Sequence, residues 1–99
     1  MKHELTTTDV FKKWQTKLKD RRAALAIATR LTRACNGNFG DVEPVGGGIS
    51  EMRIFVGKGY RVYYIIRSTG IILLLCGGDK ASQQRDIKTA KTLLKQLEE

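Results

Sequence analysis

Three apolar segments separated by short glycine-containing turns constrain the fold of this 99-residue chain most strongly. They run from about residue 49 to 56, 60 to 67 and 71 to 76, and "GKG" and "STG" connect them. Because such turns join neighbouring antiparallel strands, this stretch predicts a three-stranded meander. The last segment, "IILLLC", has no polar residue at alternate positions, which is typical of a strand inside a sheet.

Helical periodicity flanks the predicted meander on both sides. Residues 9–18, 21–35 and 82–97 place apolar residues at helical spacing, and Asp20 is a capping residue ahead of the second segment. A short strand at residues 2–6 and a long loop at residues 39–48 complete the pattern. We therefore predict one α+β domain over residues 1–99, in which two N-terminal helices and a C-terminal helix pack mainly on one face of a small, mainly antiparallel sheet.

The charge of the chain favours a polyanionic partner. The net charge is +8 and the sequence pI is about 9.8. Residues 1–40 hold nine basic and three acidic side chains, so the N-terminal part is the more electropositive. Arg22 and Arg30 lie largely off the apolar stripe of the second helix, which makes them candidates for RNA contacts. A solvated basic face is the alternative interpretation of this helix surface.

The cysteine pattern and the apolar runs argue against several other classes of protein. Cys35 and Cys76 have no CxxC spacing and no histidine cluster around them, so we expect buried free thiols, no metal and no cofactor. The start "MKHELTTTDVFKKW" lacks the apolar core of a signal peptide, and the longest apolar run is too short to span a membrane. These features predict a cytoplasmic protein without a membrane partner.

The two-residue period of the first two strands of the meander separates an apolar face from a charged one. The charged face carries Glu51, Arg53, Arg61 and Tyr63, and Lys80 follows just past the third strand. We expect the apolar face to meet the helices and the charged face to stay open. Cross-strand ion pairs are the structural alternative, but they explain less well why most of these charges are positive. The opposite set comprises Ser50, Met52, Ile54, Val56, Val62, Tyr64 and Ile66.

These residue types fit the cleavage of RNA by its own 2′-hydroxyl. That reaction needs a base near the hydroxyl, cations for the charge on the phosphorus centre, and an acid for the leaving oxygen. Arg53 and Arg61 could bind the phosphate oxygens, Glu51 could accept the proton, and Lys80 could donate one or stabilise charge. Tyr63 could stack on a base. Lys58 and Arg67, in the first turn and at the end of the second strand, are further candidates for RNA contacts.

The order of segments also carries a family resemblance. "GNFGDVEPVGGGISEMRIFVGKGYRVYY" followed by "ILLLCGGDKASQQRDIKTAKTLL" resembles the RelE/ParE toxin superfamily, in particular its HigB-like "addiction module killer protein" branch. The similarity covers nearly the whole chain, and "GYRVYY" and "GGDK" are its most specific parts. It implies a RelE-like fold. Carried over by motif, the catalytic cations of the family fall on Arg53, Arg61 and Lys80.

The resemblance implies the toxin half of a bacterial type II toxin–antitoxin pair. The implied activity is metal-independent, ribosome-dependent cleavage of mRNA, with the ribosome and mRNA as partners. The implied regulator is a small antitoxin, often a helix-turn-helix protein, through which any contact with operator DNA would be made. Two positions depart from RelE: Glu51 replaces a lysine, and Asp86 stands at the place of an aromatic acid–base residue.

Two other functions remain open from the sequence. The same fold serves ParE-like toxins that inhibit DNA gyrase without catalysis, so the fold alone does not choose between the two targets. A non-toxic RNA-binding module is the third hypothesis. The combination of Arg53, Arg61 and Lys80 favours the endoribonuclease.

Overall fold

The structure, a computed structural model, describes residues 2–98 of the chain, so residues 1 and 99 of the expected domain lie outside the described part. Its elements follow the order predicted from the sequence, with one additional strand. Within residues 2–98 they are β1 (Leu5–Thr7), α1 (Asp9–Lys17), α2 (Arg21–Cys35), β2 (Val42–Gly46), β3 (Ile49–Ile54), β4 (Tyr60–Ile66), β5 (Ile72–Gly78) and α3 (Gln83–Glu98).

The strands form one mixed sheet in the order β1-β5-β4-β3-β2. The β2–β3, β3–β4 and β4–β5 pairs are antiparallel, and β1 runs parallel to β5 at the sheet edge. The predicted meander is therefore confirmed, and β5 lies between two strands as its unbroken apolar sequence indicates. The predicted α+β class and mainly antiparallel sheet are confirmed as well.

The expectation of a long loop at residues 39–48 was wrong, because part of it forms β2 and pairs with β3. The strand was hidden by its composition. Pro44 lies inside it and the glycines at 46–48 end it, features that argue against a central strand. An edge strand tolerates proline because one side of its backbone needs no partner, and β2 is such a strand.

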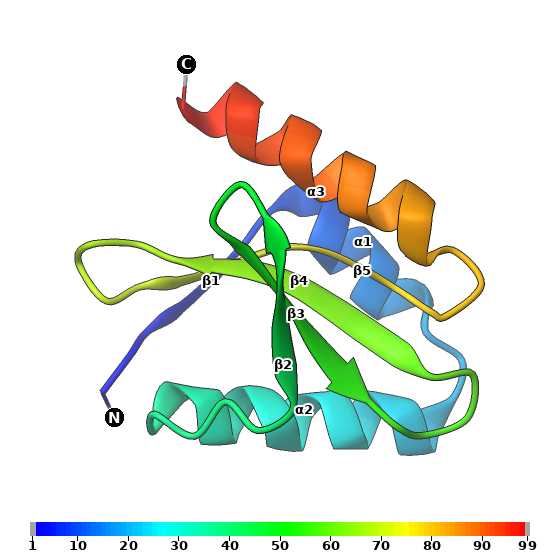
Figure 1. Cartoon of the computed structure of the whole chain (residues 1–99). Coiled ribbons are helices and arrows are strands. Elements are labelled where there is room, and N and C mark those ends of the chain that lie inside the picture. The colour runs from blue at the N-terminus through cyan, green and yellow to red at the C-terminus, as the bar shows by residue number, and fades with distance from the viewer. Residues whose placement is uncertain (1, 99) are drawn as a thin grey trace.

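The helices cover both faces of the sheet, so the expectation that they pack mainly on one face was wrong. Figure 1 shows α2 and α3 on opposite sides of the strands. Phe11 of α1 and Ile27 of α2 share one core cluster with Met52, Val62 and Leu74. The face expected to be open carries a second core, in which α3 covers the middle of β4 and β5. This second cluster comprises Ile49, Tyr63, Leu73, Leu75, Cys76, Ala90 and Leu94.

The physical reason for the second core lies in β5. Since β5 has no polar alternates, both of its faces are apolar and both must be covered. A bulge between Tyr63 and Tyr64 in the pairing with β5 adds to this, because it places Leu75 and Cys76 both in the α3-side cluster. The amphipathic α3 supplies the missing cover. No helix within residues 2–98 combines the length and apolar character needed to cross a membrane.

Candidate functional site

Three of the predicted cations meet at one end of the sheet. Arg53 of β3 lies directly opposite Arg61 of β4, and Arg61 lies opposite Gly78 at the end of β5. Lys80 follows Gly78 by two residues, and its backbone N–H points to the carbonyl of Lys58 in the β3–β4 turn at 3.5 Å. The strand register and the turn after β5 therefore bring Arg53, Arg61 and Lys80 together.

Arg61 is the most tightly held of these cations. Its side chain is only 10% exposed, and its Nη1 donates a hydrogen bond of 2.7 Å to the carbonyl of Gly59. Its Nε lies 3.6 Å from Oε2 of Glu51, an ion pair without a hydrogen bond, and this buried nitrogen has no hydrogen-bond partner in the structure. No hydrogen bond or ion pair within residues 2–98 involves its Nη2. A fixed guanidinium with unused donors at the sheet end can bind an anion.

Glu51 is buried beneath this cationic end and forms a network with three side chains. It is 1% exposed, and its Oε2 accepts hydrogen bonds of 2.9 Å from the hydroxyl of Tyr63 and from Nε2 of Gln83. The third partner is Arg61, whose charge Glu51 balances. In this arrangement the carboxylate is enclosed by protein donors and is shielded from solvent.

Tyr63 does not present its ring to solvent, contrary to the expectation of base stacking. It is 0% exposed and lies in the core beneath α3. Burial, together with the hydrogen bond to Glu51, raises the pKa of Tyr63 far above its usual value, so the hydroxyl remains a donor. The prediction failed because the sequence period assigns Tyr63 to the correct face but does not show that α3 covers the middle of that face.

Arg53 is engaged by two carboxylates of the β2 region. Its Nη2 binds Oδ1 of Asp41 at 2.9 Å, and its Nη1 binds Oε2 of Glu43 at 2.8 Å. The hydrogen bond that Arg53 donates to Asp41 is the main cause that raises the pKa of Arg53 above its usual value. The cross-strand ion pairs considered as the structural alternative therefore exist, both between Glu51 and Arg61 and at Arg53. The partners of Arg53 come from β2 and the residue before it, which the sequence did not identify as a strand.

The glycines of "GGDK" allow close packing on both faces at the end of β5. A Cβ on Gly77 would overlap the ring of Trp14 from α1, and a Cβ on Gly78 would overlap the carboxylate of Asp86 from α3. Asp86 is itself 8% exposed and accepts a short hydrogen bond from the hydroxyl of Ser82. These contacts fix the end of β5, and hence the position at which Lys80 leaves the sheet.

The other predicted RNA contacts lie in three different places. Lys58 is exposed in the turn beside Lys80, so it belongs to the cationic end. Arg67 follows the opposite end of β4, six residues from Arg61, or about 20 Å along the strand. Arg22 and Arg30 belong to α2, on the other face of the sheet. The structure therefore brings together only Lys58 with the three cations above.

Arg30 already has several partners on its own face of the sheet. Its Nη1 donates to the carbonyl of Arg53 at 2.5 Å, and its Nη2 donates to the carbonyls of Phe39 and Asp41 at 3.0 and 3.2 Å. These hydrogen bonds join α2 to the loop before β2 and to β3. Arg30 thus has a structural role that its place on the helical surface did not indicate.

Sequence reasoning missed Gln83, Asp41 and Glu43, which position Glu51 and Arg53. The available signal for Gln83 was its polar side chain at the start of α3. Because α3 crosses the charged face, its first turn lies near the buried Glu51. Recognition of β2 as a strand would have placed Glu43 opposite Glu51, beside Arg53. Cys35 and Cys76 are buried free thiols, as expected.

The fold defines the class of protein to which this chain is similar. A mutant of the Escherichia coli toxin RelE in the free state superposes with a TM-score of 0.68 at 14% identity, covering 87% of this chain and 93% of that one. A chain of the intact E. coli RelBE toxin–antitoxin complex gives 0.61 at 14% identity, covering 77% of this chain and 94% of that one. The RelBE2 toxin–antitoxin complex of Mycobacterium tuberculosis gives 0.63 at 17% identity, covering 81% and 100%. The chain therefore has a RelE-like fold.

The sequence assigns the chain to a particular family within this fold. The model of the phage-derived Gp49-like proteins matches residues 9–97, so the chain belongs to the phage-derived Gp49-like family. An uncharacterized protein of Haemophilus influenzae (strain Rd) is 47% identical over 94 residues, which is 95% of each chain.

Proposed function

We propose that this protein is a single-domain, HigB-like toxin of a type II toxin–antitoxin system, and that it cleaves mRNA on the ribosome without a metal. The observation that carries the proposal is Arg61, a nine-tenths buried arginine fixed by Glu51 and Gly59 with Lys80 beside it. A protein rarely buries an arginine without use for its charge, and this one lies at the exposed end of a sheet. The RelE-like fold and the RelE toxins among its structural neighbours support the same interpretation.

In the proposed reaction the 2′-hydroxyl of one nucleotide loses its proton to a water molecule as its oxygen attacks the adjacent phosphorus, and the bond from phosphorus to the 5′-oxygen breaks. Negative charge grows on the non-bridging oxygens, where Arg61 can donate through its guanidinium edge. The exposed ammonium of Lys80 can protonate the leaving 5′-oxygen or neutralise its charge. Glu51 acts as a positioning residue, because it holds Arg61 in one orientation. Lys58 would bind the flanking phosphates.

The proposed partners are the ribosome with its mRNA, and a cognate antitoxin. The RelBE complexes show RelE-like chains bound by their antitoxins, which supports an antitoxin here as well. A helix-turn-helix antitoxin would contact operator DNA, and the toxin would reach DNA only through it. This assignment places the protein in the cytoplasm, where translation occurs.

Primer extension on mRNA, with and without ribosomes, tests the proposal. The purified wild-type chain should generate new 5′ ends only with ribosomes present, and Arg61→Ala should slow their formation by about a hundredfold or more while leaving a measurable residual rate. Arg67→Ala is the matched control, because it removes the same side chain from the far end of β4 and should leave cleavage intact. Growth arrest with intact transcripts would refute the endonuclease, and normal growth on expression would refute the toxin.

A non-catalytic inhibitor of DNA gyrase is the second candidate. It is favoured by the engagement of Arg53 with Asp41 and Glu43, and by the burial of Glu51 and Tyr63, which leaves fewer free groups for catalysis than the sequence indicates. A supercoiling assay with purified gyrase distinguishes the two targets. Inhibition of supercoiling by the wild-type chain, with ribosome-bound mRNA left intact, would establish this alternative.

A further inference from the structure

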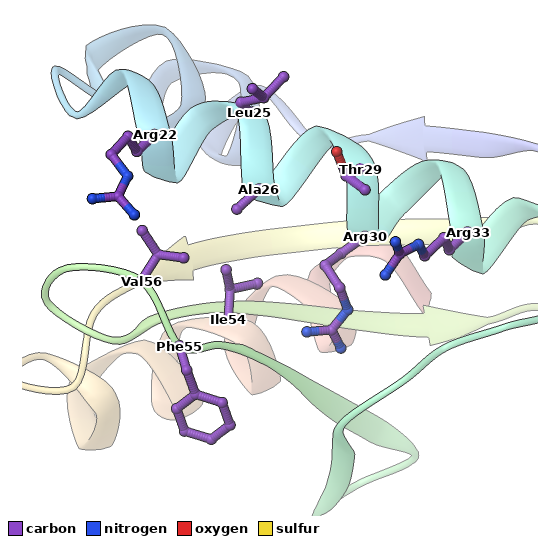
Figure 2. Close-up of a pocket in the computed structure, with 9 residues that line it drawn as sticks. All are labelled: Arg22, Leu25, Ala26, Thr29, Arg30, Arg33, Ile54, Phe55 and Val56. Atoms are coloured by element: carbon purple, nitrogen blue, oxygen red, sulfur yellow. The ribbon is translucent and has the colours of Figure 1, made fainter.

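A groove lies between α2 and the end of β3, on the sheet face opposite to α3. It has a volume of about 470 Å³, and Figure 2 shows the side chains around it. None of the four cations of the cationic end lines it. Its lining residues are Arg22, Leu25, Ala26, Thr29, Arg30, Arg33, Ile54, Phe55 and Val56.

An apolar strip crosses this groove. In Figure 2 the strip runs from Leu25 on the outer side of α2, past Ala26, Val56 and Ile54, to Phe55, whose ring points away from the helix. Leu25 is 70% exposed and Phe55 is 76% exposed, the two highest values among the exposed large hydrophobic side chains described. Leu25 and Phe55 project to opposite sides in Figure 2, so the apolar surface between the arginines is that of Leu25, Ala26, Ile54 and Val56, which a second surface would bury with gain.

Arginines stand at both ends of the strip, and the groove has no acidic side chain among its nine lining residues. Figure 2 shows Arg22 at one end, with Arg30 and Arg33 at the other. Within residues 2–98 neither Arg22 nor Arg33 forms an ion pair. Arg30 donates only to carbonyl oxygens, so its charge has no carboxylate partner in the groove. The groove is therefore apolar along its middle and positive at its ends.

We propose that this groove docks an acidic amphipathic helix of a protein partner. From Arg22 to Arg33 the helix α2 rises by about 16 Å, which matches three turns of a helix lying alongside it. Apolar residues at i, i+4 and i+7 of such a helix fit the strip, and acidic residues beside them meet the arginines. RNA fits less well, because bases stack on aromatic rings and arginine planes, whereas the strip is aliphatic between its ends.

The groove and the cationic end occupy different faces of the sheet. Tyr63 lies under α3, and Glu51 is bound by Gln83 of α3, whereas the groove borders α2. A helix docked in the groove would therefore leave Arg61 and Lys80 uncovered. The inference does not depend on the proposed cleavage activity, and it holds or fails separately from it.

Fluorescence anisotropy with a labelled peptide tests the proposal on the full chain. The probe is a helix of about 14 residues with leucines along one face and glutamates beside them, and its control carries lysines in place of the glutamates. The glutamate peptide should bind, and the lysine peptide should bind at least about tenfold more weakly. Leu25→Ser and Arg22→Ser should each weaken the glutamate peptide by about tenfold.

Leu97→Ser and Arg85→Ser are the matched controls, because both residues are exposed on α3, away from the groove. These variants should bind the glutamate peptide as the wild type does. Absence of binding, equal binding of both peptides, or equal effects of groove and control variants would overturn the proposal. It would also be overturned if single-stranded RNA displaced the peptide and lost affinity in Leu25→Ser, or if sedimentation showed a dimer that Leu25→Ser dissociates.

Discussion

Replacing Glu51 by glutamine tests whether the buried acid positions Arg61 or takes part in proton transfer. Glu51→Gln keeps the size of the side chain but removes its charge. Its carboxylate now accepts hydrogen bonds from Tyr63 and Gln83 and pairs with Arg61. The amide oxygen of glutamine can accept from both donors, but only as a neutral group. The variant therefore perturbs every contact in this network without creating a cavity.

The structure gives the size of the effect on stability. A hydrogen bond to a charged group contributes about 1.5–3 kcal/mol, and breaking one partner of a buried ion pair costs about 3–5 kcal/mol. Because the pair of Glu51 with Arg61 is 3.6 Å long and has no hydrogen bond, we expect the lower part of this range, about 3 kcal/mol. A domain of this kind has about 5–15 kcal/mol of unfolding free energy, so Glu51→Gln should remain folded.

Cleavage kinetics in a double-mutant cycle then separate the two roles. If Glu51 acts only through Arg61, Glu51→Gln should lower kcat by about tenfold or more. It should lower kcat no further in the Arg61→Ala background, and the pH profile of the residual activity should keep its shape. Urea denaturation of each variant controls for folding. An additive loss in the double variant, or disappearance of the acidic limb of the pH profile, would refute the positioning role and restore Glu51 as the base.

Three further results are expected. Gly77→Ala should lower the unfolding free energy by about 1–3 kcal/mol in thermal melts, because its Cβ overlaps the Trp14 ring. In the Trp14→Leu background the same substitution should cost less. An unchanged Tm of Gly77→Ala would contradict the steric argument. Burial raises the pKa of Cys76 to about 12, so the folded state keeps a proton that the unfolded state releases near pH 9, and stability should fall as the pH rises from about 9 towards 12. Cys76→Ala should lose less unfolding free energy over this alkaline range than the wild type. Equal losses in the two proteins would assign the pH dependence to other groups. Glu43→Gln removes one carboxylate partner of Arg53 and should strengthen the binding of single-stranded RNA severalfold at low salt, as measured by fluorescence anisotropy. An unchanged affinity would place Arg53 outside the RNA-binding surface of the protein.

The order of elements was predictable because the signals for it are local. Turn glycines, helical spacing and the capping residue Asp20 fix where most elements begin, and the structure confirms the side-chain cap of Asp20 to the N–H of Ala23. The number of covered faces was not predictable in this way. Whether α3 covers the same face of the sheet as the other helices or the opposite face depends on the apolar character of both faces of β5. That character is a property of the assembled sheet.

The gathering of Arg53, Arg61 and Lys80 at one end of the sheet was predictable, but the partners of these residues were not. Two-residue alternation correctly assigned Arg53, Arg61 and Glu51 to one side of neighbouring strands. It could not show that Gln83, more than thirty residues away, donates to Glu51, or that Asp41 lies against Arg53. Such contacts depend on the strand β2 and on the path of α3, neither of which leaves a local signal at the arginines.

The distribution of charge around the cationic end indicates the direction from which an anionic strand can approach. On the β2 side, Arg53 carries one positive charge against the two carboxylates of Asp41 and Glu43, so this side is not electropositive. On the side of the β3–β4 turn, Lys58 and Lys80 are both exposed, and the balanced pair of Arg61 and Glu51 lies between the two sides. The carboxylates on the β2 side would repel the phosphates of RNA. The RNA backbone is therefore expected to enter past Lys58 and Lys80 and to meet Arg61 there. Arg61 and Lys80, rather than Arg53, are therefore the residues on which cleavage should depend most.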